Sequence, residues 1–397
     1  PFDWGGQRSQ IPQALMSNWI GDNGFIRRLQ MALRRPLYYG DLSIYNGEVV
    51  KKFKELQEGE DAAVSSFSPT QNSAVLADNH GRRFSYLRLS ITDVCNFRCN
   101  YCLPDGYQGT DRSGFLTLEE IRRIAAAFAA MGTRKIRITG GEPSLRKDLP
   151  DVIRVLKQTH GIDTVALTTN GYRLTQQIRD WAEAGLDQLN VSIDSLDPQQ
   201  FKAITGHDKL QEILSGIEMA RELGIGNIKV NAVLLKAWNM NGFQHFLDWL
   251  KTTPVTLRFI ELMETGDNAS FFKSNHVSGE SVKQQLLDSG WQAKARGPHD
   301  GPAQEFSHPD FSGDIGLIMP YSKDFCSSCN RLRITAKGKL HLCLFGEQGY
   351  ELRPLLAEED SQILQQHIRE LLSHKKDSHH LQEGETGATR HFAMLGG

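Results

Sequence analysis

The six cysteines of this 397-residue chain form two groups of three, and both groups have spacings that suit metal chemistry. The first group, spaced CxxxCxxC, comprises Cys95, Cys99 and Cys102. The second, a CxxC pair followed after 13 residues by a third cysteine, comprises Cys326, Cys329 and Cys343. Three thiolates can each bind one iron of a four-iron cluster, which leaves the fourth iron open to a small molecule. An open iron indicates a reactive centre rather than a structural one.

Zinc is the alternative metal at both groups. Structural zinc takes four ligands, commonly from CxxC pairs, so the first group lacks a ligand. Three inert buried cysteines within eight residues would be unusual. The second group contains a zinc half-site, and His341 could supply a fourth ligand because it lies two residues before Cys343 on a predicted strand. The spacing alone therefore leaves a zinc site open at the second group.

The elements that must position these cysteines begin near Arg83, where short β-like runs alternate with helical patterns. The predicted strands are Tyr86–Ile91, Lys135–Thr139, Thr164–Thr169, Gln188–Ile193, Asn227–Leu234 and Thr256–Leu262. The predicted helices between them are Thr117–Met131, Leu149–His160, Gln176–Ala184, Lys209–Leu223 and Asn241–Lys251. This alternation predicts parallel strands with right-handed crossovers, in a partial barrel or a doubly wound sheet. Both architectures bind ligands at the carboxyl ends of the strands, where the first cysteine group lies.

The alternation fades after residue 265. A helix is predicted over Val277–Ser289, a hairpin over Arg331–Leu344 and a further helix over Arg353–Ser373. Residues 1–75 stand apart as an extension of unknown role, with short helices expected at Phe25–Leu37 and Val49–Leu56. We therefore expect three parts: the extension 1–75, a core 76–265 and a C-terminal domain 266–397.

Composition narrows the classes of protein. Apolar residues make up 39% and charged residues 23%, which fits a folded globular protein and excludes a wholly disordered chain. The formal net charge of −2 gives no electrostatic argument for binding nucleic acid or a membrane surface. No apolar run approaches the roughly 20 residues that span a bilayer. Six cysteines are too few for a disulfide scaffold, and no signal peptide is apparent, so we expect a cytoplasmic protein.

The segment CNFRCNYC at Cys95–Cys102 resembles the signature of radical S-adenosylmethionine (SAM) enzymes. In that family the open iron is chelated by SAM, and one electron cleaves SAM into methionine and a 5′-deoxyadenosyl radical that abstracts a hydrogen atom. The resemblance implies that the radical is generated at this cluster, and it assigns no catalytic side chain. It implies SAM contacts from four residues: Tyr101, Gly141 in the GGEP segment, Ser192 and Met263.

The order of the motifs is more specific. LRLSITDVCNFRCNYC, KIRITGGEP, LTTNG, VSID, IKVN, the second cysteine group and a terminal Gly-Gly together are similar to the GTP 3′,8-cyclase family of molybdenum cofactor biosynthesis. The similarity runs from about Arg82 to Gly397. It implies a partial (β/α)6 TIM-like barrel, the radical SAM core, with a C-terminal domain that carries a second [4Fe-4S] cluster. The implied lyase removes hydrogen from C3′ of GTP and joins C3′ to C8, which gives (8S)-3′,8-cyclo-7,8-dihydroguanosine 5′-triphosphate.

The resemblance also implies substrate contacts and partners. The GTP contacts would be Arg88, Arg137, Thr168, Lys229, Arg331, Leu332 and Arg333, with Arg258 as a further candidate. No P-loop is present, so ordinary GTPase binding is not expected. The terminal Gly396 and Gly397 would reach the active site. A cyclic pyranopterin monophosphate synthase would act downstream, an electron donor is required, and a homodimer is left open. The alternatives are another twin-cluster radical SAM enzyme that modifies a peptide or RNA, and a non-catalytic zinc-binding module.

Overall fold

The computed structural model describes residues 75–109, 114–297, 301–358 and 360–387, which belong to one structural unit that spans Ser73–Gly397. The helices expected at Phe25–Leu37 and Val49–Leu56, and the terminal Gly396–Gly397, lie outside the described residues. Among the helices in these ranges, none is long and apolar enough to cross a membrane.

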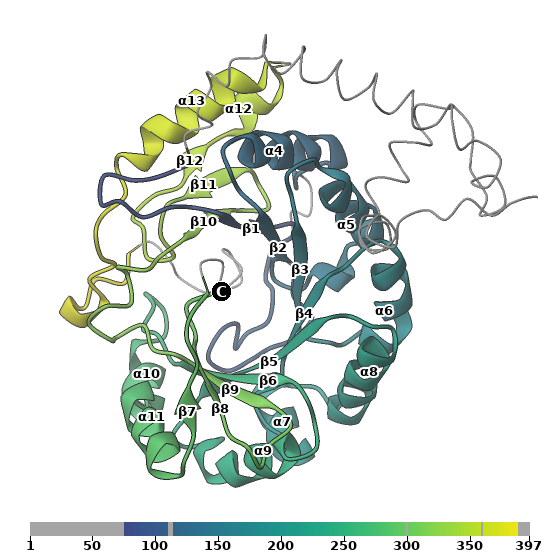
Figure 1. The fold of residues 1–397 in the computed structure, drawn as a ribbon, viewed down its shortest axis with the longest axis vertical. Helices are drawn as coiled ribbons and strands as arrows, with labels where there is room; N and C mark the ends of the chain where they lie inside the picture. Colours follow the sequence, from purple (N-terminus) through teal and green to yellow (C-terminus); the bar gives the residue numbers. More distant parts are fainter. Residues whose placement is uncertain (1–74, 110–113, 298–300, 359, 388–397) are drawn as a thin grey trace, which may run out of the picture. The chain divides into compact units, whose positions relative to one another are not determined.

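Six parallel strands form the centre of one sheet (Figure 1). Their bounds are β1 Tyr86–Ser90, β2 Lys135–Thr139, β3 Thr164–Thr169, β4 Gln188–Ser192, β5 Asn227–Leu234 and β6 Thr256–Glu261. All six lie where the sequence predicts them, and β1, β4 and β6 each end one residue earlier than expected. Along β1, the apolar side chains Leu87 and Leu89 join the core, while Tyr86 and Arg88 point into a cavity. Because successive side chains of a strand point to opposite faces of the sheet, the outer face is packed and apolar and the inner face is polar.

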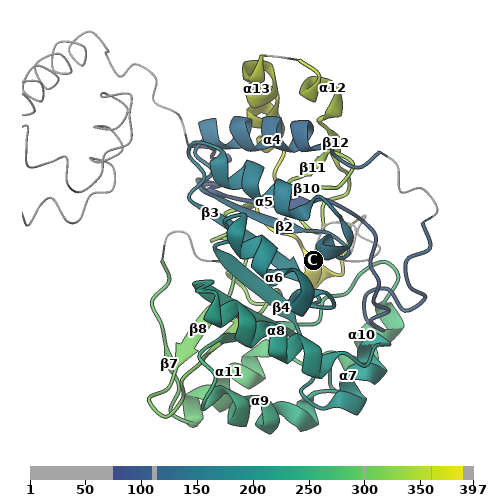
Figure 2. The same cartoon turned by 90° about the vertical axis from the view of Figure 1, so that its right-hand side faces the viewer.

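Helices cover the outer face of the sheet, and Figure 2 shows α4, α5, α6 and α8 stacked along it. Their bounds are α4 Leu118–Ala130, α5 Leu149–Gln158, α6 Leu174–Glu183, α7 Pro198–Thr205, α8 Leu210–Glu222 and α9 Phe243–Leu250, with short 3-10 turns η2 Pro143–Leu145 and η3 Met240–Gly242. A capping box starts α4: the Glu120 amide donates to the Thr117 hydroxyl at 3.2 Å, and the Thr117 amide donates to the Glu120 carboxylate at 2.8 Å. The sequence reading missed α7, which Asp197 caps.

The residues after 265 continue the sheet at both of its edges. The added strands are β7 Gln292–Ala293, β8 Gln304–Ser307, β9 Asp314–Ile318, β10 Arg331–Ile334, β11 Lys339–His341 and β12 Tyr350–Glu351. Strand β9 pairs in parallel with β6, and β10 pairs in parallel with β1. The full order is β12-β11-β10-β1-β2-β3-β4-β5-β6-β9-β8-β7, so the sheet is curved but not closed. A partial barrel, rather than a doubly wound sheet, is confirmed, because helices cover one face and a cavity occupies the other.

The remaining helices differ from prediction where one expected helix is divided into two. They are α10 Ala269–Asn275, α11 Gly279–Asp288, α12 Arg353–Leu356, α13 Ser361–Leu372 and the 3-10 turn η4 Leu381–Glu383. The single helix predicted over Arg353–Ser373 is two helices, since the Asp360 carboxylate caps a new start by accepting from the Gln362 amide at 2.8 Å. The predicted hairpin is confirmed as β10–β11, with Gly338 at φ 83° in its turn.

Candidate active site

All six cysteines line one cavity of about 260 Å³ on the inner face of the sheet. Cys95, Cys99 and Cys102 lie on the loop after β1, while the second group lies on the loop before β10 and just beyond β11. None of the six is in a disulfide, and each is partly exposed. The two groups meet because β10 pairs with β1, although the sequence separates them widely. One cavity is therefore lined by all six cysteine side chains, none of them in a disulfide.

The loop of the first group is anchored to the end of α7. The amides of Arg98 and Asn100 donate to the carbonyls of Thr205 and Ile204 at 3.0 and 3.1 Å. Burial, aided by the charge of Glu142, raises the pKa of the Cys95 thiol to about 12. Burial also raises the pKa of Cys99 well above its usual value. A bound iron cation stabilises the thiolate form of a buried cysteine. The three cysteines therefore fit the ligand set of an iron–sulfur cluster.

The GGEP segment packs directly on the loop that leads to Cys95. A Cβ on Gly141 would lie 2.4 Å from the Val94 carbonyl oxygen, so only glycine fits there. The buried Glu142 carboxylate accepts from the Thr169 hydroxyl and the Asn170 amide, both at 2.6 Å. Burial raises the pKa of Glu142, and these hydrogen bonds partly oppose the rise. The segment thus has a structural task, joining β2 and β3 to the cysteine loop, besides lining the cavity.

A row of arginines lies across three neighbouring strands. The register places Arg333 of β10 beside Arg88 of β1, and Arg88 beside Arg137 of β2. Together with Arg258 and Arg331 they line the cavity. Burial and the charge of Arg333 lower the pKa of Arg88 well below its usual value. Like charges packed so closely are unfavourable unless an anion lies among them.

Several of these guanidinium groups have buried N–H groups with no protein acceptor. Within the described ranges, Arg137 Nε, Arg331 Nη1 and Arg333 Nε are buried without a hydrogen-bond partner. In contrast, Arg258 donates to Asn231 and Asn190 at 3.0 and 2.9 Å. Buried donors left unpaired are costly. The arrangement therefore fits a polyanionic ligand such as a triphosphate, which arginine binds in bidentate fashion.

Most of the residues implied by the resemblance line this cavity, and two do not. The lining set includes Tyr101, Gly141, Ser192, Met263, Arg88, Arg137, Thr168, Arg331 and Arg333. The Leu332 side chain is buried in the hydrophobic core, because it alternates with the inward-facing Arg331 and Arg333. Lys229 forms an ion pair with Glu305 at 2.6 Å and is not among the lining residues. Both remain expectations as GTP contacts.

The sequence reading missed some lining residues that the alternation of the strands could have revealed. Tyr86 lies two residues before Arg88, and Lys135 and Arg137 lie over its ring at 5.4 and 5.5 Å from the centroid. Burial opposes the change, but the surrounding cations, led by Arg137 and Arg88, lower the pKa of Tyr86 to about 8. Asp194, which accepts from the Tyr101 hydroxyl at 2.9 Å, follows β4. Burial raises the pKa of Asp194 to about 6.

A single zinc ion and a four-iron cluster need different arrangements of the thiolates. Among the residues that the structure describes, no three His, Cys, Asp or Glu side chains converge as ligands of one metal ion. A four-iron cluster does not require such convergence, because each thiolate binds a different iron. His341 is not a lining residue of the cavity, and burial together with Arg333 lowers its pKa to about 4.

This fold and site define a radical SAM enzyme. The model of the Radical SAM superfamily matches residues 89–250, and the model described as Molybdenum Cofactor Synthesis C matches residues 255–381. Among solved structures, Streptococcus suis SuiB bound to S-adenosylmethionine gives a TM-score of 0.54 at 12% identity, over 89% of this chain and 76% of that chain. That likeness shows a shared fold. As a radical SAM enzyme, the protein uses SAM and an iron–sulfur cluster.

The sequence relatives are more specific. The GTP 3′,8-cyclase of Pectobacterium atrosepticum is 56% identical over 325 residues, which cover 81% of this chain and 99% of that relative. The GTP 3′,8-cyclase of Aeromonas hydrophila is 56% identical over 328 residues and is covered to 96% of its length. This chain belongs to the GTP 3′,8-cyclase family. The resemblance indicated by the order of the motifs is confirmed.

Proposed function

We propose that this protein is a lyase that converts GTP into (8S)-3′,8-cyclo-7,8-dihydroguanosine 5′-triphosphate in molybdenum cofactor biosynthesis. The observation that carries the proposal is the meeting of two three-cysteine groups and five arginines around one cavity. A SAM-cleaving centre alone would need one cysteine group. The second group and the arginine row together match the guanine and the triphosphate of a nucleotide.

At one end of the cavity, Cys95, Cys99 and Cys102 bind a [4Fe-4S] cluster whose open iron takes SAM. Bound there, SAM would supply the radical chemistry that hydrogen abstraction from C3′ of GTP requires. Tyr101, Gly141, Ser192 and Met263 contact SAM. The hydrogen bond from Tyr101 to Asp194 supports this role, because it orients the ring within the cluster loop.

At the other end, Cys326, Cys329 and Cys343 bind a second [4Fe-4S] cluster against which guanine docks. Arg88, Arg137, Arg331 and Arg333 bind the phosphates, and Arg258 and Thr168 complete the wall. Leu332 contributes through its backbone, since its side chain is in the core. Lys229 also binds a phosphate of GTP when its ion pair with Glu305 opens. Fixing the nucleotide so that C3′ and C8 meet is proximity catalysis.

The proposal includes partners. An external donor supplies one electron for SAM cleavage and a second electron that, with a proton from solvent, reduces the nucleotide radical left after C3′ joins C8. A cyclic pyranopterin monophosphate synthase consumes the product. We propose a cytoplasmic location, because cysteine thiolates that bind clusters need a reducing compartment. The contribution of a homodimer stays open.

Anaerobic incubation with SAM, a reductant and GTP tests the function. We expect 5′-deoxyadenosine and the cyclised nucleotide in equal amounts, and about eight irons per chain for two four-iron clusters. Zinc without iron would contradict the proposal and favour a zinc-binding module. SAM cleavage that GTP neither stimulates nor couples to a nucleotide product would favour a radical SAM enzyme with another substrate.

A further inference from the structure

A buried lysine lies behind the second cysteine group, and the proposed reaction assigns it no role. Lys375 follows α13 and is 5% exposed, yet it is not among the residues that line the cavity. Its ammonium group donates to the Leu342 carbonyl, next to Cys343, and lies 5.5 Å from the centroid of the Phe84 ring. The ion pairs found among the described residues include none for Lys375. A buried ammonium without a carboxylate is costly unless another anion compensates it.

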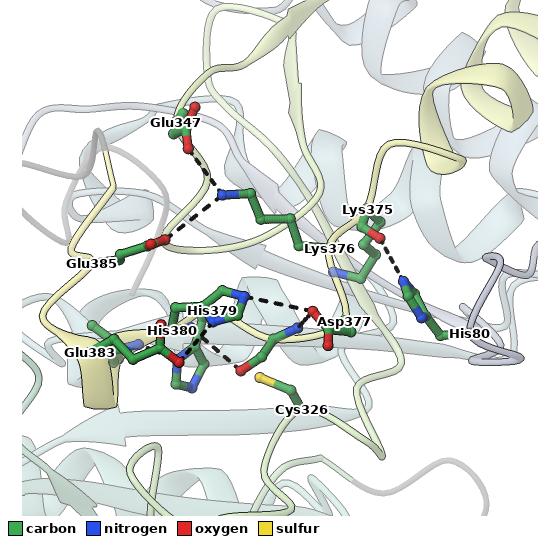
Figure 3. A network of polar contacts seen from close by, with 12 residues as sticks. His80, Cys326, Glu347, Lys375, Lys376, Asp377, His379, His380, Glu383 and Glu385 are labelled. Atoms are coloured by element: carbon green, nitrogen blue, oxygen red, sulfur yellow. Dashed lines mark hydrogen bonds and ion pairs between the residues drawn. The ribbon is translucent and has the colours of Figure 1, made fainter.

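The backbone around Lys375 is firmly anchored, so the position of this charge is built into the fold. His80 donates to the Lys375 carbonyl at 3.2 Å, and Figure 3 shows this contact. Arg82, itself paired with Asp78 at 2.6 Å, donates to the carbonyls of Lys376 and Asp377 at 2.6 and 2.7 Å. The same guanidinium donates to the Cys326 carbonyl at 3.3 Å. These contacts join the segment to the cysteine loop.

The groups that favour the charged form of Lys375 are two thiols of the second group. Cys329 and Cys343 interact electrostatically with its ammonium, whereas Arg82 and Arg333 repel it. The neighbouring Lys376 points elsewhere: its side chain is 57% exposed and pairs with Glu347 at 3.0 Å (Figure 3). A four-iron cluster bound by three thiolates is anionic, and one-electron reduction adds a further negative charge. A fixed cation beside it stabilises the reduced form.

We propose that Lys375 is a positioning residue for the second cluster, a built-in counter-charge that raises the reduction potential of that cluster and ties its Cys343 side to the C-terminal segment. The inference rests on the proposed second cluster and deepens it. The role is electrostatic, because Lys375 lies behind the cysteines rather than against the substrate.

The test compares Lys375→Gln, Lys375→Arg and the matched control Lys376→Gln in the full-length, cluster-loaded protein. The measurements are iron content and the midpoint potential of the second cluster, followed by electron paramagnetic resonance during a dithionite titration. We expect Lys375→Gln, which keeps a donor for the Leu342 carbonyl, to shift the midpoint to a more negative value. Lys375→Arg should stay close to the parent, and Lys376→Gln should not shift. An unchanged midpoint in Lys375→Gln overturns the proposal.

Loss of the second cluster is informative as well. Loss in Lys375→Gln with retention in Lys375→Arg supports the proposal, because only the charge separates the two. Loss in both variants overturns it and assigns Lys375 a packing role. A parent protein with about four irons per chain would instead contradict the second cluster itself, and so the proposed function, before any variant is compared.

Discussion

The two ends of the cavity differ in the charged side chains around them, although each presents three cysteines. At the first end the neighbours are the buried carboxyl groups of Glu142 and Asp194, and burial raises the pKa of Cys95 to about 12. At the second end burial also opposes ionisation of Cys329. There, however, the charges of Arg331 and Lys375 outweigh it and lower the pKa to about 7. The same donor set thus lies in two different environments.

The difference matches the charges of the two small molecules that we propose to bind. SAM carries a sulfonium cation, which suits an end with acidic neighbours, whereas GTP is a polyanion, which suits the arginine row. In this proposal, the charges around each cysteine group discriminate between the two ligands. The spacing of the cysteines contributes little to that choice.

The largest expected effect comes from Cys99→Ser. This change removes a thiolate from the first cluster, so we expect no detectable SAM cleavage and no cyclised nucleotide. Its counterpart at the other end, Cys329→Ser, should stop cyclisation but leave some uncoupled SAM cleavage. Quantifying 5′-deoxyadenosine and nucleotide product in both variants is the measurement. A Cys329→Ser protein that cyclises GTP at the parent rate would show that the second end is not catalytic.

Deletion of Gly396–Gly397 should come next in size. These residues lie outside the described ranges, and the prediction follows from the family resemblance alone. We expect both clusters to be retained and the coupling of SAM cleavage to cyclisation to be largely lost, because two residues without side chains can enter a narrow space beside a substrate. The ratio of 5′-deoxyadenosine to product is the readout. The same ratio and rate in the truncated protein would exclude a role for the tail.

Arg331→Ala and Arg333→Ala should each weaken GTP binding by about 1.5–3 kcal/mol, the range for a hydrogen bond to a charged group. That corresponds to roughly a 10- to 150-fold rise in the dissociation constant. SAM affinity should hardly change. Isothermal titration of both ligands measures the effect, with Arg122→Ala on the exposed face of α4 as the control. Equal losses of SAM and GTP affinity would contradict a division of labour between the ends.

Gly141→Ala tests the first end through packing. The new methyl group would meet the Val94 and Asp93 carbonyl oxygens at 2.4 and 2.6 Å. We expect about 1–3 kcal/mol of destabilisation from this overpacking, together with weaker SAM binding. Denaturant unfolding measures the first and titration the second. Gly226→Ala is the control, because the nearest atom to its Cβ would be 3.8 Å away. Parent stability in Gly141→Ala would disprove the close approach.

Glu305→Gln should have the smallest effect, at the edge of the second end. It removes the carboxylate that pairs with Lys229 at 2.6 Å and so frees the ammonium group for a phosphate. Because the pair is partly exposed, we expect GTP binding to tighten by about 1 kcal/mol or less. Titration with GTP against the parent protein measures it. Weaker binding would mean that Glu305 supports the substrate site and that Lys229 does not exchange partners.

Local patterns in the sequence were enough to predict the strands and the type of chemistry expected of the cysteines. The alternation of apolar and polar residues predicted β1 to β6 almost to the residue, since each strand needs a packed outer face. The spacing of the cysteines predicted two three-thiolate sites. The same alternation could have indicated Tyr86 as an inward neighbour of Arg88, because residues two apart on a strand share a face.

Long-range strand pairing brings together segments that are far apart in the sequence. The pairing of β10 with β1 brings the second cysteine group opposite the first and aligns Arg333, Arg88 and Arg137. No local pattern near residue 331 indicates that β10 pairs with β1. The alternation fades after residue 265 as predicted, but the sequence did not place the later strands in the same sheet. The partners of Lys229 and Lys375 were equally hidden. Periodicity reports how a segment folds on itself, whereas long-range pairing depends on the packing of the whole sheet.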